Sequence, residues 1–204
     1  MKLYFTPRTC SLAPHIVIRE LGLDVELRRV RIGPDPVVAD DGSDYRRLNP
    51  LGYVPLLELD DGRLLGEGVA IMQYLADLHP AAGLAPAAGT FERVELQQWL
   101  TFISSELHKS FSPWLFHPEY GEQAMQVARM RIDNRFAHVE HHLEGRDWLL
   151  GDRFGIADAY LFTIADWSRL LKVSLTSFPR LAAYLERVRA RDSVGEALRR
   201  EKAA

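Results

Sequence analysis

The sequence has one cysteine, no long hydrophobic run and no excess of positive charge, and each absence excludes a class of protein. A single cysteine cannot form an internal disulfide, so nothing requires an oxidising compartment. No apolar run approaches the ~20 residues that cross a bilayer, and no N-terminal stretch has the pattern of a signal peptide. The net charge of −3 gives no electrostatic reason to expect nucleic acid. We therefore expect a cytoplasmic protein with no nucleic-acid or membrane partner.

The first eighty residues alternate strand and helix signals. Alternating or continuous apolar residues predict strands, 3.6-residue periodicity predicts helices, and Asp-Gly predicts a tight turn between two short strands. The glycine- and proline-rich segment 33–50 is predicted as a surface loop with at most one helical turn. The predicted order is β-α-β-loop-β-β-α, with strands at 2–6, 25–32 and on both sides of the Asp-Gly turn within 54–68, and helices within 11–23 and 67–78.

Strand signals disappear after residue 90. Residues 79–90 contain two prolines and two glycines, which is typical of a linker. Helical periodicity follows in four segments, at 91–111, 122–144, 157–171 and 178–191. With 47% hydrophobic residues among 204, the chain can bury a substantial core. We predict an α/β domain over 1–80, a linker over 81–90 and an all-helical domain over 91–204.

The only cysteine, Cys10, lies in FTPRTCSLAPHI, where the first strand ends and a helix begins. A thiol at a helix start faces unpaired N–H groups and the positive end of the helix dipole, which lower its pKa. A buried cysteine acting as a small apolar residue is the alternative. The motif reads CSLA and has no second cysteine. Any second sulfur in a redox cycle must therefore come from outside the chain.

Two other segments of the first domain could bind a ligand. In NPLGYVPLLEL, a cis Val54-Pro55 bond would leave the Val54 backbone open to a ligand, and a trans proline opening an edge strand is the alternative. Glu67 and Gly68 stand at a predicted helix start, where N–H groups suit a carboxylate and the Glu67 side chain suits an ammonium. Together they could hold an α-amino acid, or Glu67 could merely stabilise its own helix.

In the helical half, SSELHKSFSP has a polar face that includes Ser104 and Lys109. Ser105 and His108 are three residues apart, so we expect them on the same side of the helix. A solvated helix face is the alternative. His138, His141 and His142 have helical spacing that could bind zinc, but no further ligand is evident nearby, and we expect no metal. Aromatic side chains could line an apolar pocket or belong to the core, namely Phe111, Trp114, Phe116 and Trp167.

Taken in order, five segments resemble the cytosolic glutathione S-transferases, and among them the bacterial beta class. They are MKLYFTPRTCSLAPHI, NPLGYVPLLEL, EGVAIMQYLADL, SSELHKSFSP and DRFGIADAYLF. The resemblance covers essentially the whole chain. It implies a thioredoxin-like N-terminal domain followed by an all-helical C-terminal domain, usually in a homodimer, with glutathione as co-substrate.

The resemblance also implies roles for individual residues. Cys10 would lie beside the glutathione sulfur and could form a mixed disulfide with it, and Val54 would pair through its backbone with the cysteinyl part. Glu67 and Gly68 would grip the γ-glutamyl end, and His108 would lie near the thiol. The implied catalytic residues are Cys10, Ser11 and His108. The implied binding residues are Cys10, Val54, Glu67, Gly68, Thr101, Ser105, Glu106, Leu107 and His108.

Three positions depart from the family pattern. A lysine is usual in the loop near residues 35–37, where this chain has DPV, and Arg46 or Arg47 could replace it. Thr101 stands where asparagine is common. In FGIAD, Gly155 precedes Asp158 of a helix-capping box, and we expect this glycine to cap by backbone freedom alone.

We therefore predict a transferase that conjugates the glutathione thiolate to small hydrophobic electrophiles, because a depressed thiol pKa supplies the reactive anion. Two alternatives use the same fold. One is a thiol-disulfide oxidoreductase in which Cys10 attacks and glutathione resolves the bond. The other is a non-catalytic binding protein on the same fold.

Overall fold

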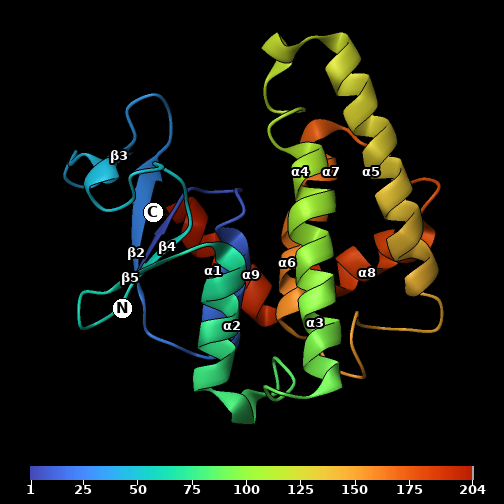
Figure 1. The fold of residues 1–204 in the computed structure, drawn as a ribbon, viewed down its shortest axis with the longest axis horizontal. Coiled ribbons are helices and arrows are strands. Elements are labelled where there is room, and N and C mark those ends of the chain that lie inside the picture. The colour runs from blue at the N-terminus through green and yellow to red at the C-terminus, as the bar shows by residue number, and fades with distance from the viewer. Residues whose placement is uncertain (204) are drawn as a thin grey trace. The chain divides into compact units, whose positions relative to one another are not determined.

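The computed structural model describes residues 1–203 and divides the chain into two compact units (Figure 1). The first unit contains residues 1–82 and the chain from Ala190 onward, and the second contains Gly83–Arg189. Within the described residues, no helix is both long enough and apolar enough to cross a membrane.

The first unit is built on a mixed sheet with strand order β3-β2-β1-β4-β5. β1 (Lys2–Phe5) is central, parallel to β2 (Glu26–Arg31) and antiparallel to β4 (Leu56–Glu58), which pairs with β5 (Leu64–Gly66). The parallel pair needs a crossover connection, which α1 (Leu12–Glu20) supplies. The predicted order of strands and helices in this part of the chain is therefore confirmed.

One strand was missed. β3 (Val37–Val38) pairs with β2 inside the segment predicted as a loop, and the single helical turn of that loop is η1 (Tyr45–Arg47). Two residues are too few to display an alternating pattern. Val38 is buried in a small core cluster, and this packing holds the strand in place. The cluster contains Tyr4, Val30, Val38, Tyr45, Val54 and Leu56.

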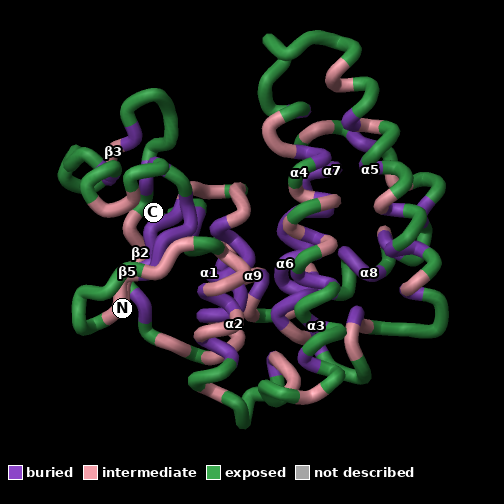
Figure 2. The backbone as a smooth tube through the Cα atoms, viewed as in Figure 1, coloured by how far each residue is buried: buried purple, intermediate pink, exposed green. Residues whose placement is uncertain are grey.

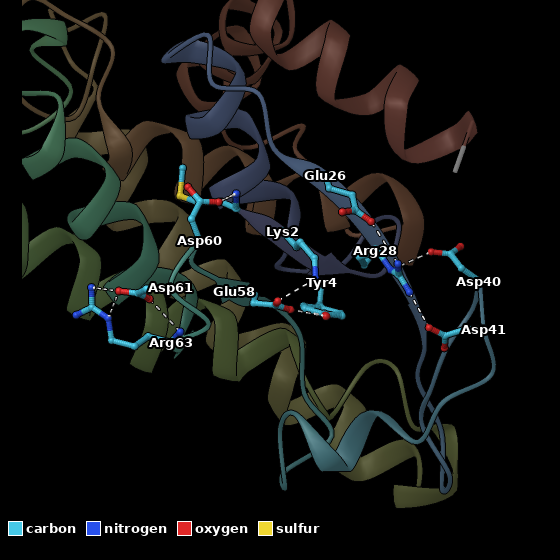
Figure 3. A network of polar contacts seen from close by, with 11 residues as sticks. Lys2, Tyr4, Glu26, Arg28, Asp40, Asp41, Glu58, Asp60, Asp61 and Arg63 are labelled. Carbon is cyan, nitrogen blue, oxygen red and sulfur yellow. Dashed lines mark hydrogen bonds and ion pairs between the residues drawn. The ribbon is translucent and has the colours of Figure 1, made fainter.

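Side-chain hydrogen bonds tie neighbouring strands of this sheet together (Figure 3). Glu58 on β4 lies opposite Lys2 on β1; it accepts from Lys2 Nζ at 2.9 Å and from the Tyr4 hydroxyl at 2.7 Å. Burial, together with the bond to Glu58, raises the pKa of Tyr4 to about 12. Arg28 on β2 donates to Asp41 at 2.8 Å and so holds the loop that follows β3.

Three helices complete the first unit: α1, α2 (Gly68–Leu78) and α9 (Asp192–Ala203). α9 was not predicted, and the predicted helical domain ran to residue 204. In the structure the chain from Ala190 groups with the first unit, because α9 packs against α1. Its buried residues Val194, Ala197 and Glu201 follow helical spacing, and a carboxylate within the stripe obscures its apolar pattern.

The second unit is helical, as predicted. A continuous helical rod comprises α3 (Phe91–Phe102), the π-helical segment η3 (Ile103–His108) and α4 (Lys109–Phe111). It is followed by α5 (Glu122–His142), α6 (Ile156–Ala165), α7 (Trp167–Leu171) and α8 (Pro179–Arg189). The single helix predicted at 157–171 is thus two helices that break at Asp166. α6 is buried along its whole length and forms the centre of this unit (Figure 2).

Asp158 organises the start of α6. Its carboxylate accepts from the Gly155 N–H at 2.8 Å, the Leu149 N–H at 2.9 Å and the Tyr184 hydroxyl at 2.7 Å. Gly155 has φ −140°, a conformation that any residue adopts, so the expected reliance on backbone freedom is wrong. A Cβ at this position would lie 2.9 Å from the Leu84 carbonyl oxygen. Close approach of the backbone is therefore the reason for glycine.

This contact predicts that Gly155→Ala destabilises the protein. The added methyl group must displace the Leu84 backbone, and overpacking of this kind costs about 2 kcal/mol. Urea unfolding followed by circular dichroism measures the loss. Gly33→Ala is the matched control, because a Cβ there meets nothing within 4 Å. Equal stability of the two variants would contradict the close-approach explanation.

Candidate functional site

Cys10 lies in the loop between β1 and α1 and is half-buried. Its Sγ–H donates to the carbonyl oxygen of Val54 at 3.4 Å. The Val54-Pro55 peptide bond is cis. The fold therefore brings together two of the predicted site residues from segments 44 positions apart.

The amides at the start of α1 are not open to a ligand. The N–H of Ser11 donates to Thr9 Oγ1 at 3.3 Å, that of Leu12 to the Thr9 carbonyl at 3.1 Å, and that of Ala13 to the Cys10 carbonyl at 3.3 Å. Pro14 has no N–H. The expectation that Cys10 faces unpaired N–H groups is therefore wrong for Ser11, Leu12 and Ala13.

Ser11 stabilises the loop that carries Cys10. It is fully buried, and its hydroxyl donates to the Thr6 carbonyl at 3.0 Å while accepting from the Thr6 N–H at 3.2 Å. A hydroxyl held in this way has no surface open to a substrate. The geometry favours a structural role for Ser11 over the catalytic role that the resemblance implied.

Val54 has a fixed backbone with one open hydrogen-bonding group. Its side chain belongs to the core cluster under β3, and the adjacent Tyr53 carbonyl accepts from the Tyr45 hydroxyl at 2.9 Å and from the Asn49 amide at 2.7 Å. Within residues 1–203 the Val54 N–H has no hydrogen-bond acceptor. It is therefore able to pair with an extended peptide ligand.

The start of α2 is different from the start of α1. Across the described chain the amides of Gly68, Val69 and Ala70 have no acceptor, and the exposed Glu67 side chain makes no cap. Glu67 has φ 62°, a left-handed conformation that costs a non-glycine residue about 1–3 kcal/mol and is frequent at binding sites. A Cβ at Gly68 would lie 3.5 Å from Pro55 Cγ, so this helix end packs against the cis proline.

An arginine reaches the loop that lacks the expected lysine. Arg46 Nη1 lies 3.6 Å from Asp35 Oδ1, and both side chains are exposed. Arg47 is also exposed, without an ion pair among the residues that the structure describes. Of the two candidate replacements, Arg46 is the one whose guanidinium lies at the loop.

In the second unit, four of the predicted site residues lie on the π-helical segment η3. Its wider i→i+5 turn changes which side chains share a face, and such turns are frequent at functional sites. Ser105 is exposed and donates to the Thr101 carbonyl at 2.9 Å, whereas the His108 ring packs toward α6 and α7. The expectation that Ser105 and His108 share a side is wrong, because it assumed α-helical geometry.

The other residues of this segment have distinct environments. Glu106 accepts from Arg135 on α5 at 2.5 Å and 3.2 Å, and this ion pair lowers the pKa of the carboxyl. Leu107 is fully buried, so it contributes packing rather than a polar contact. Thr101 is exposed, and its carbonyl also accepts from Ser104 at 3.0 Å.

His108 is held by Tyr160 and Trp167. Its Nδ1 is 2.9 Å from the Tyr160 hydroxyl, and its ring stands edge-on to the Trp167 ring with centroids 5.1 Å apart. Burial, reinforced by the neighbouring Lys109 charge, lowers the pKa of His108 to about 4. The imidazole is therefore neutral at pH 7. Sequence reasoning missed Tyr160, because it occupies an ordinary apolar position of a predicted helix.

Two of the four candidate pocket aromatics belong to the core. Phe111 is fully buried and Trp167 is 6% exposed, whereas Trp114 and Phe116 are 42% and 37% exposed. The Phe116 ring packs on Trp167 with centroids 5.0 Å apart. Trp114 and Phe116 thus offer the apolar surface that a ligand could reach.

The predicted histidine group packs around an aromatic ring. His138 and His142 lie on Trp99, with ring centroids 5.6 Å and 4.4 Å away. Over residues 1–203, no group of three histidine, cysteine or acidic side chains is arranged to hold a metal ion.

The fold and these contacts define a class: a thioredoxin-like unit with a cis proline and an open helix N-terminus, followed by a helical unit. Two family models match, described as the N-terminal domain of glutathione S-transferase over residues 8–78 and its C-terminal domain over residues 92–192. The chain is similar to glutathione S-transferase GstA of Escherichia coli O157:H7, with 42% identity over 98% of both chains.

Solved structures agree. A sphingomonad glutathione S-transferase complexed with glutathione is 40% identical, with a TM-score of 0.94 over 100% of both chains. A bacterial beta class glutathione S-transferase of Sphingomonas chungbukensis is 39% identical, with a TM-score of 0.92 over 98% of both chains. The chain belongs to the glutathione S-transferase family, and to its bacterial beta class. Its activity is that of a glutathione transferase, and the comparisons do not favour the oxidoreductase or the non-catalytic alternative.

The low pKa of His108 predicts a pH-dependent stability. As pH falls from 6.5 to about 4, His108 binds a proton in the unfolded chain but stays unprotonated in the folded protein. Stability should therefore decrease over that window, by on the order of 2 kcal/mol. Urea unfolding at several pH values measures the slope. His108→Gln should flatten it, whereas His141→Gln, at an exposed histidine, should leave it unchanged. A slope that survives in His108→Gln would contradict the assignment.

Proposed function

We propose that the first unit binds glutathione along a path from Glu67 to Cys10. The observation that carries the proposal is the open N-terminus of α2 packed against Pro55. Its amides at Gly68, Val69 and Ala70 suit the γ-glutamyl carboxylate, since a helix N-terminus favours an anion. The exposed Glu67 carboxylate suits the ammonium group of the same amino acid.

The cysteinyl part of glutathione pairs with the Val54 backbone in this proposal. The Val54 N–H has no acceptor in the described chain, and the Val54 carbonyl already accepts from Cys10 Sγ at 3.4 Å. A ligand cysteine paired at Val54 would therefore have its sulfur near Cys10. Arg46, whose guanidinium lies at the loop near residue 35, supplies a cation for the glycyl carboxylate. The nucleophile is the glutathione thiolate itself.

The electrophile is a small hydrophobic molecule. Trp114 and Phe116 support this part of the proposal, because their exposed ring faces can stack on an apolar substrate. On the second unit, neutral His108 supplies a hydrogen-bonding imidazole, while Thr101 and Ser105 contribute polar groups on exposed positions. Glu106 and Leu107 act through the ion pair with Arg135 and through packing. We also propose a cytoplasmic location, which the lone cysteine supports because it needs no oxidising compartment.

Glu67→Gln tests the glutathione site. Losing a charge-assisted hydrogen bond costs about 1.5 kcal/mol, so the KM for glutathione should rise roughly tenfold in a conjugation assay with a model aromatic electrophile. Asp24→Asn removes another exposed carboxylate of the same unit and should leave this KM unchanged. An unaltered KM in Glu67→Gln would remove the basis for the proposed path.

The same assay tests the role of Cys10. Conjugation should persist in Cys10→Ala within about tenfold, since the attacking sulfur belongs to glutathione. Complete loss of conjugation would instead assign the nucleophile to Cys10. Urea unfolding of the variant separates either result from a folding defect.

We also propose that the protein is a homodimer, as is usual for the class. Large apolar side chains stay exposed on α3 and α5, where Phe91 is 73% and Met130 62% exposed, with Val94 and Val127 one helical turn away on the same helices. Light scattering after gel filtration should give twice the mass of one chain. Phe91→Ser combined with Met130→Ser should give the monomer mass, whereas Leu170→Ser, at another exposed apolar residue, should not. A monomeric unmodified protein would refute the proposal.

A further inference from the structure

The peptide unit between Tyr53 and Val54 has its two polar ends in different surroundings. The Tyr53 carbonyl oxygen accepts two hydrogen bonds, from the Tyr45 hydroxyl at 2.9 Å and from the Asn49 side-chain amide at 2.7 Å. The Val54 N–H has no acceptor within residues 1–203. One end of this peptide unit is therefore fully bonded within the first unit, and the other is free to meet a ligand.

The geometry of the peptide unit links these two ends. The Tyr53–Val54 bond is trans, and a trans peptide is planar, with its C=O and N–H directed to opposite sides. Holding the carbonyl therefore also sets the direction of the N–H. Two donors restrain the plane more than one would, because rotating it lengthens or bends at least one of the two bonds. The Val54 N–H is thereby directed away from Tyr45 and Asn49.

Tyr45 and Asn49 are themselves well held. The Tyr45 side chain is fully buried, and its ring packs on that of Tyr4 with centroids 5.7 Å apart. Burial raises the pKa of the Tyr45 hydroxyl above its usual value, so this group stays protonated and donates at neutral pH. Asn49 Oδ1 accepts from the Leu51 N–H at 3.2 Å, and this bond directs the amide nitrogen to the Tyr53 carbonyl.

We propose that Tyr45 and Asn49 are positioning residues for glutathione, because they fix the Tyr53 carbonyl so that the Val54 N–H is directed at the cysteinyl carbonyl of the ligand. The proposal rests on the proposed function in one respect, namely the pairing of the cysteinyl part with the Val54 backbone. In this role neither side chain contacts glutathione. A peptide unit that is already oriented in the free protein loses less conformational freedom on binding, so the two side chains increase the affinity for glutathione.

One NMR signal reports on this peptide unit alone. Tyr53–Val54 is the only place in the chain where a valine follows a tyrosine. Labelling with carbonyl-¹³C tyrosine and ¹⁵N valine therefore gives a single carbonyl-to-amide cross-peak. A carbonyl carbon resonates further upfield when its oxygen accepts fewer hydrogen bonds. Without glutathione, we expect Tyr45→Phe and Asn49→Asp each to move the ¹³C resonance upfield, since each variant removes one donor to the Tyr53 oxygen.

The conjugation assay measures the effect on the ligand. Tyr45→Phe should raise the KM for glutathione about fivefold, the equivalent of one lost hydrogen bond, and leave kcat unchanged. Asn49→Asp should do the same, and it does not depend on repacking the core because Asn49 is only partly buried.

Tyr4→Phe is the matched control. It removes the hydroxyl of another buried tyrosine in the same core cluster, which donates to Glu58 at 2.7 Å (Figure 3). This variant loses a comparable hydrogen bond without touching the Tyr53 carbonyl. It should therefore leave the KM for glutathione unchanged and the carbonyl resonance in place.

Three results would overturn the proposal. An unmoved carbonyl resonance in the two variants is one, and an unchanged KM in them is another; if Tyr45→Phe does not fold, Asn49→Asp decides. The third is an equal rise of KM in Tyr4→Phe, because general loosening of the core cluster would then explain the effect. Failure of the proposed function is separately visible, since glutathione added to the unmodified protein would then leave the Val54 amide proton resonance unmoved.

Discussion

Packing of the α2 N-terminus against Pro55 is the constraint on which the proposed glutathione site depends. Gly68 packs against the proline ring, where even an added Cβ would lie at ordinary van der Waals distance from Pro55 Cγ, and Glu67 takes a left-handed conformation at the start of the helix. Cys10 joins the same group through its bond to the Val54 carbonyl. Three segments far apart in the chain are thereby held around one backbone edge. The open amides of α2 therefore lie at the same backbone edge as Val54 and Cys10.

The two helix N-termini near this edge differ in whether their backbone amides already have hydrogen-bond acceptors. Thr9 and Cys10 occupy the amides at the start of α1, whereas those of α2 stay open. For this reason the proposed binding of the ligand carboxylate uses α2 and not α1. The fully buried Ser11 hydroxyl fixes the loop beside Cys10, so this residue affects the site through the shape of the backbone.

In the second unit, the π-helical turn and the core aromatics determine the chemistry of His108. The turn directs the imidazole toward α6 and α7, where burial keeps it uncharged. An α-helical continuation would have grouped His108 with Ser105 on one face. The same core that stabilises this unit therefore sets the protonation state of a predicted site residue. Exposed Trp114 and Phe116 remain available to a substrate because they lie outside that core.

The amino-acid sequence by itself determined most of the element order and the change from mixed to helical structure, because periodicity and turn residues act over short distances. It also gave Cys10, Val54, Glu67 and His108 as candidate site residues. It could not reveal β3, which two residues specify too weakly, or α9, whose buried stripe includes Glu201.

Only the tertiary structure decided that Gly155 is required by the Leu84 carbonyl, that the α1 amides are occupied, and that Tyr160 contacts His108. Each of these facts depends on the exact position of groups that packing and loop geometry bring together. Local sequence patterns carry no information on such positions, because these positions are set by burial and hydrogen bonding in the folded chain.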